Sequence, residues 1–127
     1  MRIEEALFTE FSGILNLRFF PLTAQQGTAF PYGVYTLTGA DRTMKLTGFE
    51  GVVTATYQID VFHGTYANLK TLKDLIVAKI KTFNFRNLGG SGPYCQSVEI
   101  TEDVETYDPQ TKEYQCTLDI QITFKEV

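Results

Sequence analysis

Apolar and polar residues alternate most regularly near the carboxyl end of the chain, in residues 114–124. Every even position there is apolar or aromatic, and the odd positions carry only Gln, Thr and Asp. A two-residue period predicts a strand with one face in the core and the other in water. Because the polar face carries no obvious catalytic group, the pattern raises the question of what this surface does.

A long hairpin is expected over the last third of the chain. Val98, Ile100 and Val104 share the apolar face of its first strand, and Asp108-Pro109 begins its turn. With the turn centred near Gln110, the numbers of paired residues sum to about 220.

The two cysteines are not expected to form a disulfide. On the expected register Cys116 faces Val104 and Cys95 faces Lys125, and the two thiols lie on opposite faces of the sheet. Two free cysteines fit a reducing compartment, and a lone pair at this spacing is no metal motif.

Two helices are indicated by apolar residues at intervals of three and four. The first lies within residues 3–17 and ends before Pro21; the second spans residues 65–83, with Thr65 as its N-cap. The stripe residues are Ile3, Leu7, Phe11 and Ile14 in the first helix and Leu69, Leu72, Ile76, Ile80 and Phe83 in the second.

Two further strands are expected between these helices. Residues 32–39 are rich in β-branched and aromatic residues, and residues 52–62 alternate between an apolar and a polar face. The stretch between them, residues 39–51, shows no clear period and is interpreted as a long connecting loop.

The order helix, strand, strand, helix, strand, strand predicts one α+β domain over residues 1–127. Hairpins with one polar face favour an antiparallel four-stranded sheet, with the two helices packed on its dry face. At 127 residues the chain is too short for two domains.

Composition narrows the classes of partner. A net charge of −4 and a pI near 4.9 disfavour general nucleic-acid binding, which relies on Lys and Arg. No apolar run approaches a membrane span, so no membrane partner is expected. The amino end has no features of an export signal, and we expect a cytoplasmic site of synthesis and use.

Candidate chemistry is sparse, and we expect no enzyme, no cofactor and no metal site. His63 is the only histidine and is interpreted as a strand-end or interface residue; the alternative is a hydrolase that uses it as a base. The Gly-rich stretch 89–92 follows a helix and precedes a strand, which is the wrong order for a phosphate loop, and is interpreted as a flexible connector.

The charges of the chain separate by element. The second helix is basic, with Lys70, Lys73, Lys79, Lys81 and Arg86. The polar face expected for the last hairpin is acidic, because its odd-numbered positions include Glu99, Asp103, Glu105 and Asp119. In a ring, opposite charge on opposite flanks favours head-to-tail contacts. The alternative is an ordinary solvated surface.

Three stretches together resemble a known family. They are "AFPYGVYTL" (29–37), "YQIDVFHGTYANLKTLKDLI" (57–76) and "ETYDPQTKEYQCTLDIQITF" (105–124). Their order and spacing resemble the tail completion, or tail terminator, proteins of long-tailed bacteriophages and prophages. The family's turn often has Gly where this chain has Lys112 or Glu113, and the stretch 39–51 has no counterpart.

The resemblance implies a non-catalytic subunit that assembles into a homo-oligomeric ring, commonly a hexamer. Such a ring caps the tail tube protein, ends tube polymerisation and joins the tail to the connector of the filled head. DNA passes through it without specific binding. The resemblance therefore implies a location in the tail or neck of the virion, after assembly in the cytoplasm of a host bacterium.

Three groups of residues are candidate contact sites within this hypothesis. Subunit or tail-tube contacts are assigned to Asp41, Arg42, Met44 and Phe49. A channel-lining or inter-subunit face is assigned to Gln115, Thr117, Asp119 and Gln121, since a wet, neutral-to-acidic wall does not retain DNA. A basic docking face is assigned to Lys70, Lys73 and Lys81.

Two other functions remain open. A head-completion or neck protein of the same particle differs little at the level of sequence. A small-ligand-binding regulatory domain is also compatible with two helices on an antiparallel sheet, and requires an apolar cleft with converging polar groups.

Overall fold

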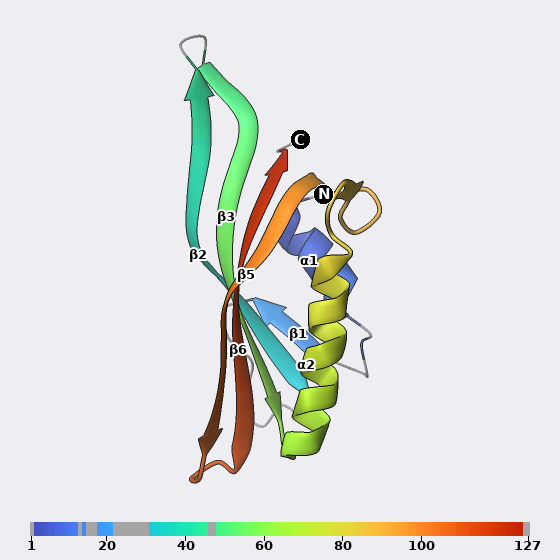
Figure 1. Ribbon diagram of the computed structural model, residues 1–127, viewed down its shortest axis with the longest axis vertical. Helices are drawn as coiled ribbons and strands as arrows, with labels where there is room; N and C mark the ends of the chain where they lie inside the picture. Colours follow the sequence, from blue (N-terminus) through green and yellow to red (C-terminus); the bar gives the residue numbers. More distant parts are fainter. Residues whose placement is uncertain (1, 13, 15–17, 22–30, 46–47, 126–127) are drawn as a thin grey trace.

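The computed structural model describes residues 2–12, 14, 18–21, 31–45 and 48–125. Within them the helices and strands follow one another as α1 (Ile3–Phe11), β1 (Arg18–Pro21), β2 (Tyr32–Lys45), β3 (Gly48–His63), α2 (Tyr66–Lys81), β4 (Arg86–Asn87), β5 (Tyr94–Asp108) and β6 (Glu113–Lys125) (Figure 1). The chain is α+β, as the sequence predicts.

The prediction of a four-stranded sheet is wrong. The sheet has six strands in the order β1-β2-β3-β6-β5-β4. Five of them run antiparallel to their neighbours, and β1 adds to the edge in parallel with β2. The additional strands β1 and β4 have four and two residues. Elements this short show no measurable period in the sequence, so the pattern of apolar residues does not predict them.

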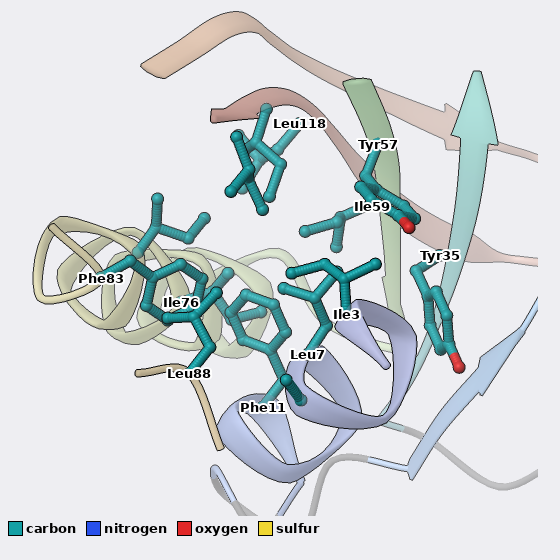
Figure 2. Close-up of a cluster of buried hydrophobic side chains, with 14 of the residues drawn as sticks. Ile3, Leu7, Phe11, Tyr35, Tyr57, Ile59, Ile76, Phe83, Leu88 and Leu118 are labelled. Atoms are coloured by element: carbon teal, nitrogen blue, oxygen red, sulfur yellow. The ribbon is translucent and has the colours of Figure 1, made fainter. Parts of the chain in front are cut away.

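Both helices pack on one face of this sheet (Figures 1 and 2). Ile3, Ala6, Leu7 and Phe11 of α1 are buried, as are Leu69, Leu72, Ile76 and Ile80 of α2. They meet the odd residues of β3 and the even residues of β6, from Cys116 to Phe124. The prediction that the even face of β6 belongs to the core is confirmed. Helix α1 ends at Phe11, earlier than the apolar stripe indicated.

The predicted loop over residues 39–51 is wrong, because β2 and β3 continue through most of it as a hairpin. Strand β6 accompanies β3 only from Val52 onward. Residues 43–45 and 48–51 therefore form a two-stranded extension, here called the β2–β3 arm, which projects from the body (Figure 1). Two register shifts in β2, at Leu37/Gly39 and Arg42/Met44, interrupt the two-residue period that identifies a strand.

The register of the last hairpin also differs from the prediction. Cys95 lies opposite Phe124, not Lys125, and Cys116 lies opposite Glu105, not Val104. The turn is centred between Gln110 and Thr111, so the first pairs sum to 221 and Cys116 lies opposite Glu105. Register shifts at Ile100/Glu102 and Cys95/Ser97 then lower the sum to 219 at Cys95, and each extra residue reverses the face of those that follow. Val98 and Ile100 pack against the core as expected, but Val104 does not and is 44% exposed.

The turn of the last hairpin contains a residue in the left-handed region. Lys112 has φ 57°, a conformation that glycine adopts without a Cβ clash. This is one of the two positions at which the chain departs from the glycine of the resembled family. Asp108 supports the turn by accepting a hydrogen bond from the Gln110 backbone N–H at 2.9 Å.

Candidate assembly surfaces

The face of the sheet opposite the helices is here called the open face. It is formed by the even residues of β3 from Thr54 to Asp60 and the odd residues of β6 from Gln115 to Thr123. All four predicted face residues of β6 lie on it, and each is partly buried. They are Gln115, Thr117, Asp119 and Gln121.

Asp60 organises the polar groups at one end of the open face. Its side chain is 9% exposed and accepts hydrogen bonds from Thr117 Oγ1 at 2.6 Å, Gln58 Nε2 at 2.9 Å and Gln115 Nε2 at 3.0 Å. At the other end, the hydroxyls of Thr54 and Thr123 lie 3.1 Å apart. These polar groups are occupied with one another, so this part of the surface has few donors left for a ligand.

The open face is acidic to neutral. Residues 54–62 and 113–123 contain no Lys, Arg or His, and they carry Asp60, Glu113 and Asp119. Strand β5 adds Glu99 and Glu102, paired with Gln121 and Asp119. Carboxylates without neighbouring cations repel a phosphate backbone. Electrostatics and hydrogen bonding therefore both make this face unsuited to holding nucleic acid.

Two of the three predicted docking residues of α2 face acidic residues of the same chain. Lys73 Nζ lies 2.6 Å from Asp103 Oδ1, and Lys70 Nζ lies 3.1 Å from Glu105 Oε2. The register shift at Ile100/Glu102 turns Asp103 and Glu105 toward the helices, so they leave the strip that parity predicted. The hydrogen bond to Glu105 raises the pKa of Lys70. Lys81, the third predicted docking residue, is exposed.

A buried carboxylate fixes the connection between α2 and β5. Glu10 of α1 is 8% exposed and receives two hydrogen bonds from the Arg86 guanidinium, at 2.7 and 2.9 Å. The Gly89 backbone N–H donates to the same carboxylate at 2.7 Å, and Leu88 is fully buried beside it. The Gly-rich stretch is thus anchored to α1, contrary to its interpretation as a flexible connector.

Phe85 is displayed on this anchored segment. Its side chain is 74% exposed, and its backbone has φ 62°. Left-handed backbone costs a bulky residue roughly 1 kcal/mol relative to glycine. The backbone N–H of Phe85 donates to the Cys95 carbonyl oxygen at 2.8 Å, so the backbone conformation serves the start of β4, but the exposed ring has no such role within the chain. Phe85 is therefore a candidate contact residue that no sequence pattern indicates.

Replacing Phe85 with Asn is expected to raise the free energy of unfolding by roughly 0.5 kcal/mol, because Asn tolerates the left-handed region. Urea unfolding measures the change. Phe8→Asn is the matched control, since Phe8 is also exposed but lies in a regular helix, where Phe and Asn have similar propensities. Equal shifts in both variants would contradict the assignment to backbone conformation.

The predicted contact residues Asp41, Arg42, Met44 and Phe49 lie at the base of the β2–β3 arm and within it. Met44 is opposite Phe49 in the register, and Arg42 is opposite Val53. The structure thus brings these four residues to one end of the sheet, away from the open-face residues of β6 near Gln115.

The remaining reactive groups do not cluster. His63 ends β3, and its Nδ1 accepts a hydrogen bond from the Gly64 N–H at 2.8 Å; burial lowers its pKa. Cys95 and Cys116 are free and buried, and burial raises the pKa of each thiol to about 11. Among the described residues no group of three or more His, Cys, Asp or Glu could hold a metal ion. No described helix is long and apolar enough to span a membrane.

One groove bears on the ligand-binding alternative. It lies between α2 and Ile14, which follows α1, and has a volume of about 410 Å³; it is lined by Ile14, Leu75, Ala78, Lys79 and Thr82. It is an open surface groove, whereas ligand-binding domains enclose most of the ligand. The described residues therefore give little support to the alternative of a small-ligand-binding domain.

Comparison with known proteins finds a likeness at the level of structure. No family model matches the chain, and no curated protein matches it. Among solved structures, the fold is similar to a chain in the virion of a native gene transfer agent particle, with a TM-score of 0.63 and 12% sequence identity. The similarity covers 97% of this chain and 94% of that chain. At this identity the likeness shows a shared fold.

Proposed function

We propose that this protein is a structural component of a phage-like virion that caps the tail tube as a ring, commonly a hexamer. In this role it ends tube polymerisation and presents a surface to the head connector. The observation that carries the proposal is the full-length fold shared with a chain of a gene transfer agent virion. The three stretches that resemble tail terminators support the same role independently.

The surfaces of the subunit are suited to this role. The open face, with Gln115, Thr117, Asp119 and Gln121, supplies a wall of internally bonded and acidic groups along which DNA passes without being held. A cross-linking map or ring structure that puts these residues on the outer rim would contradict the channel-lining role.

The β2–β3 arm is the proposed contact with the tail tube. A two-stranded hairpin is marginally stable in water by itself, so a projecting arm is suited to docking on a partner. Its apolar Met44 and Phe49, with Asp41 and Arg42 at the base, supply contact area and charge. Lys81 is the remaining candidate for docking through α2, because Lys70 and Lys73 are paired within the subunit.

Deletion of the gene from the particle-producing genome tests the proposal by electron microscopy of the lysate. A tail terminator predicts tubes of irregular, excessive length together with unattached filled heads. A head-completion or neck protein, the alternative role, predicts unattached tails of normal length. Normal particles in the deletion strain would overturn both.

A complementation series then tests the arm. Met44→Ser/Phe49→Ser is expected not to restore normal tubes, because the variant removes the two apolar contacts of the arm. Gln110→Ser, in the turn of the last hairpin, is the matched control and is expected to complement fully. Full complementation by the arm variant would remove the arm from the tube contact.

A further inference from the structure

Both edges of the sheet leave long stretches of strand without a described neighbour. Strand β1 pairs with β2 only from Tyr32 to Tyr35, and β4 pairs with β5 only at Tyr94 and Cys95. Residues 36–45 of β2 and 99–108 of β5 have no further strand on their outer side in the described part of the chain. Unpaired backbone N–H and C=O groups along an edge are a template for another strand.

The two edges differ in charge. Strand β5 contains Glu99, Glu102, Asp103, Glu105 and Asp108 and no Lys or Arg, whereas β2 contains Asp41, Arg42 and Lys45. Asp103 and Glu105 are paired with Lys73 and Lys70. Two copies of β5 placed edge to edge would still bring Glu99, Glu102 and Asp108 of one copy close to those of the other, which is destabilising. Pairing of β5 with β2 avoids that repulsion. The charges thus select against a symmetric β5–β5 contact and favour a head-to-tail contact.

Strand direction and exposed apolar residues agree with the same contact. Three successive antiparallel pairs lead from β2 through β3 and β6 to β5, so β2 and β5 run in opposite directions. A neighbouring copy in the same orientation therefore presents its β2 antiparallel to β5. Leu37 on β2 and Val104 and Tyr107 on β5 are each more than 40% exposed along these edges.

We propose that β5 of one copy of this chain pairs with β2 of the next copy, antiparallel, so that the sheet continues from subunit to subunit. The closed ring in which this contact would end rests on the proposed function, but the pairing is a property of the chain itself. In such an assembly the open faces of successive subunits form one continuous surface. The contact also adds a third strand beside the base of the β2–β3 arm.

Paired cysteines test this contact. Gly39→Cys on β2 is combined with Val104→Cys on β5, and Thr36→Cys and Thr106→Cys provide neighbouring registers; all four positions lie on the open face. Within one subunit the two positions are separated by three strand spacings, ~14 Å, too far for a disulfide. The native thiols are buried with raised pKa values and react slowly. A disulfide between introduced cysteines therefore reports two copies side by side.

Oxidation of a concentrated sample is expected to give a ladder of multimers on a non-reducing gel in at least one of the four double variants. Each single variant should give no species above a dimer. Thr71→Cys/Val104→Cys is the matched control, because Thr71 is exposed on helix α2 and not on a strand edge. Ladders no longer than in that control, or products that stop at dimers, would overturn the proposal.

The outcomes separate this inference from the proposed function. A ladder together with normal tails in the deletion strain would leave the edge contact standing and remove the tail-cap role. Irregular tubes in the deletion strain without any ladder would leave the tail-cap role standing and overturn the edge contact.

Discussion

Replacing Glu10 with Gln is expected to lower the free energy of unfolding by about 2 kcal/mol at neutral pH. The carboxylate is nearly buried and accepts both N–H groups of the Arg86 fork as well as the Gly89 backbone N–H. The amide of Gln has nearly the same volume but no charge and only one acceptor oxygen. The partly buried Arg86 guanidinium therefore loses one of its two hydrogen bonds and its ion pair. The estimate lies below that for a fully buried pair because the Arg86 side chain is 35% exposed.

The effect should depend on pH in a defined direction. The hydrogen bond from Arg86 lowers the pKa of Glu10 below its ordinary value of 4.5, against the opposing effect of burial. A group with a lowered folded pKa contributes its full stability above the unfolded pKa and loses it as the pH falls through the folded value. The difference between wild type and Glu10→Gln is therefore expected to be constant near pH 7 and to shrink below about pH 4.5.

Urea unfolding at pH 7 and pH 3 measures both statements. Glu5→Gln is the matched control, because Glu5 lies on the same helix but is exposed. Its loss should be within about 0.5 kcal/mol, from its place near the amino end of the helix. A Glu10→Gln loss no larger than that of the control, or one that grows as the pH falls, would contradict the role assigned to this carboxylate.

Periodic elements of this chain could be predicted because burial imposes a repeat on them. The sequence pattern identifies the even face of β6, the odd face of β3 and the stripe of α2, of which Leu69, Leu72, Ile76 and Ile80 are buried as expected. The same logic fails at a bulge. Each register shift inserts one residue without changing the local composition, so the sequence pattern places Val104 on the core face and predicts a loop where the β2–β3 arm lies.

Contacts between distant residues were beyond prediction for a different reason. Glu10 and Arg86 lie 76 positions apart, and neither interrupts its local pattern. The pairing of Lys73 with Asp103 likewise depends on the register shift at Ile100/Glu102. Of the candidate surfaces, the open face follows from the alternation of apolar and polar residues alone, whereas no pattern in the sequence predicts the exposure of Phe85. Its left-handed backbone is set by the anchored turn around it.

Gly92→Ala is expected to destabilise the protein by about 2–3 kcal/mol through overpacking. A Cβ at this position would collide with the backbone oxygen of Leu88 and approach Ala6 Cβ to 2.9 Å. The oxygen cannot withdraw freely, because it accepts the hydrogen bond of the Gly92 N–H at 2.8 Å. Relief of the collision therefore requires movement of the turn or of α1, both of which are held by the Glu10–Arg86 pair.

Gly39→Ala separates this collision from the general effect of removing a glycine. A Cβ at Gly39 meets nothing within 4 Å, so that variant should be neutral or gain up to about 0.5 kcal/mol from the reduced entropy of its unfolded chain. Both variants are compared by the urea midpoint at constant slope. The Glu10–Arg86 pair and the turn at Gly92 belong to one structural unit. The stability lost by Gly92→Ala together with Glu10→Gln should therefore be smaller than the sum of the two single losses. Coincident midpoints for Gly92→Ala and Gly39→Ala would show that the turn yields freely, and would remove the rigid support that displays Phe85.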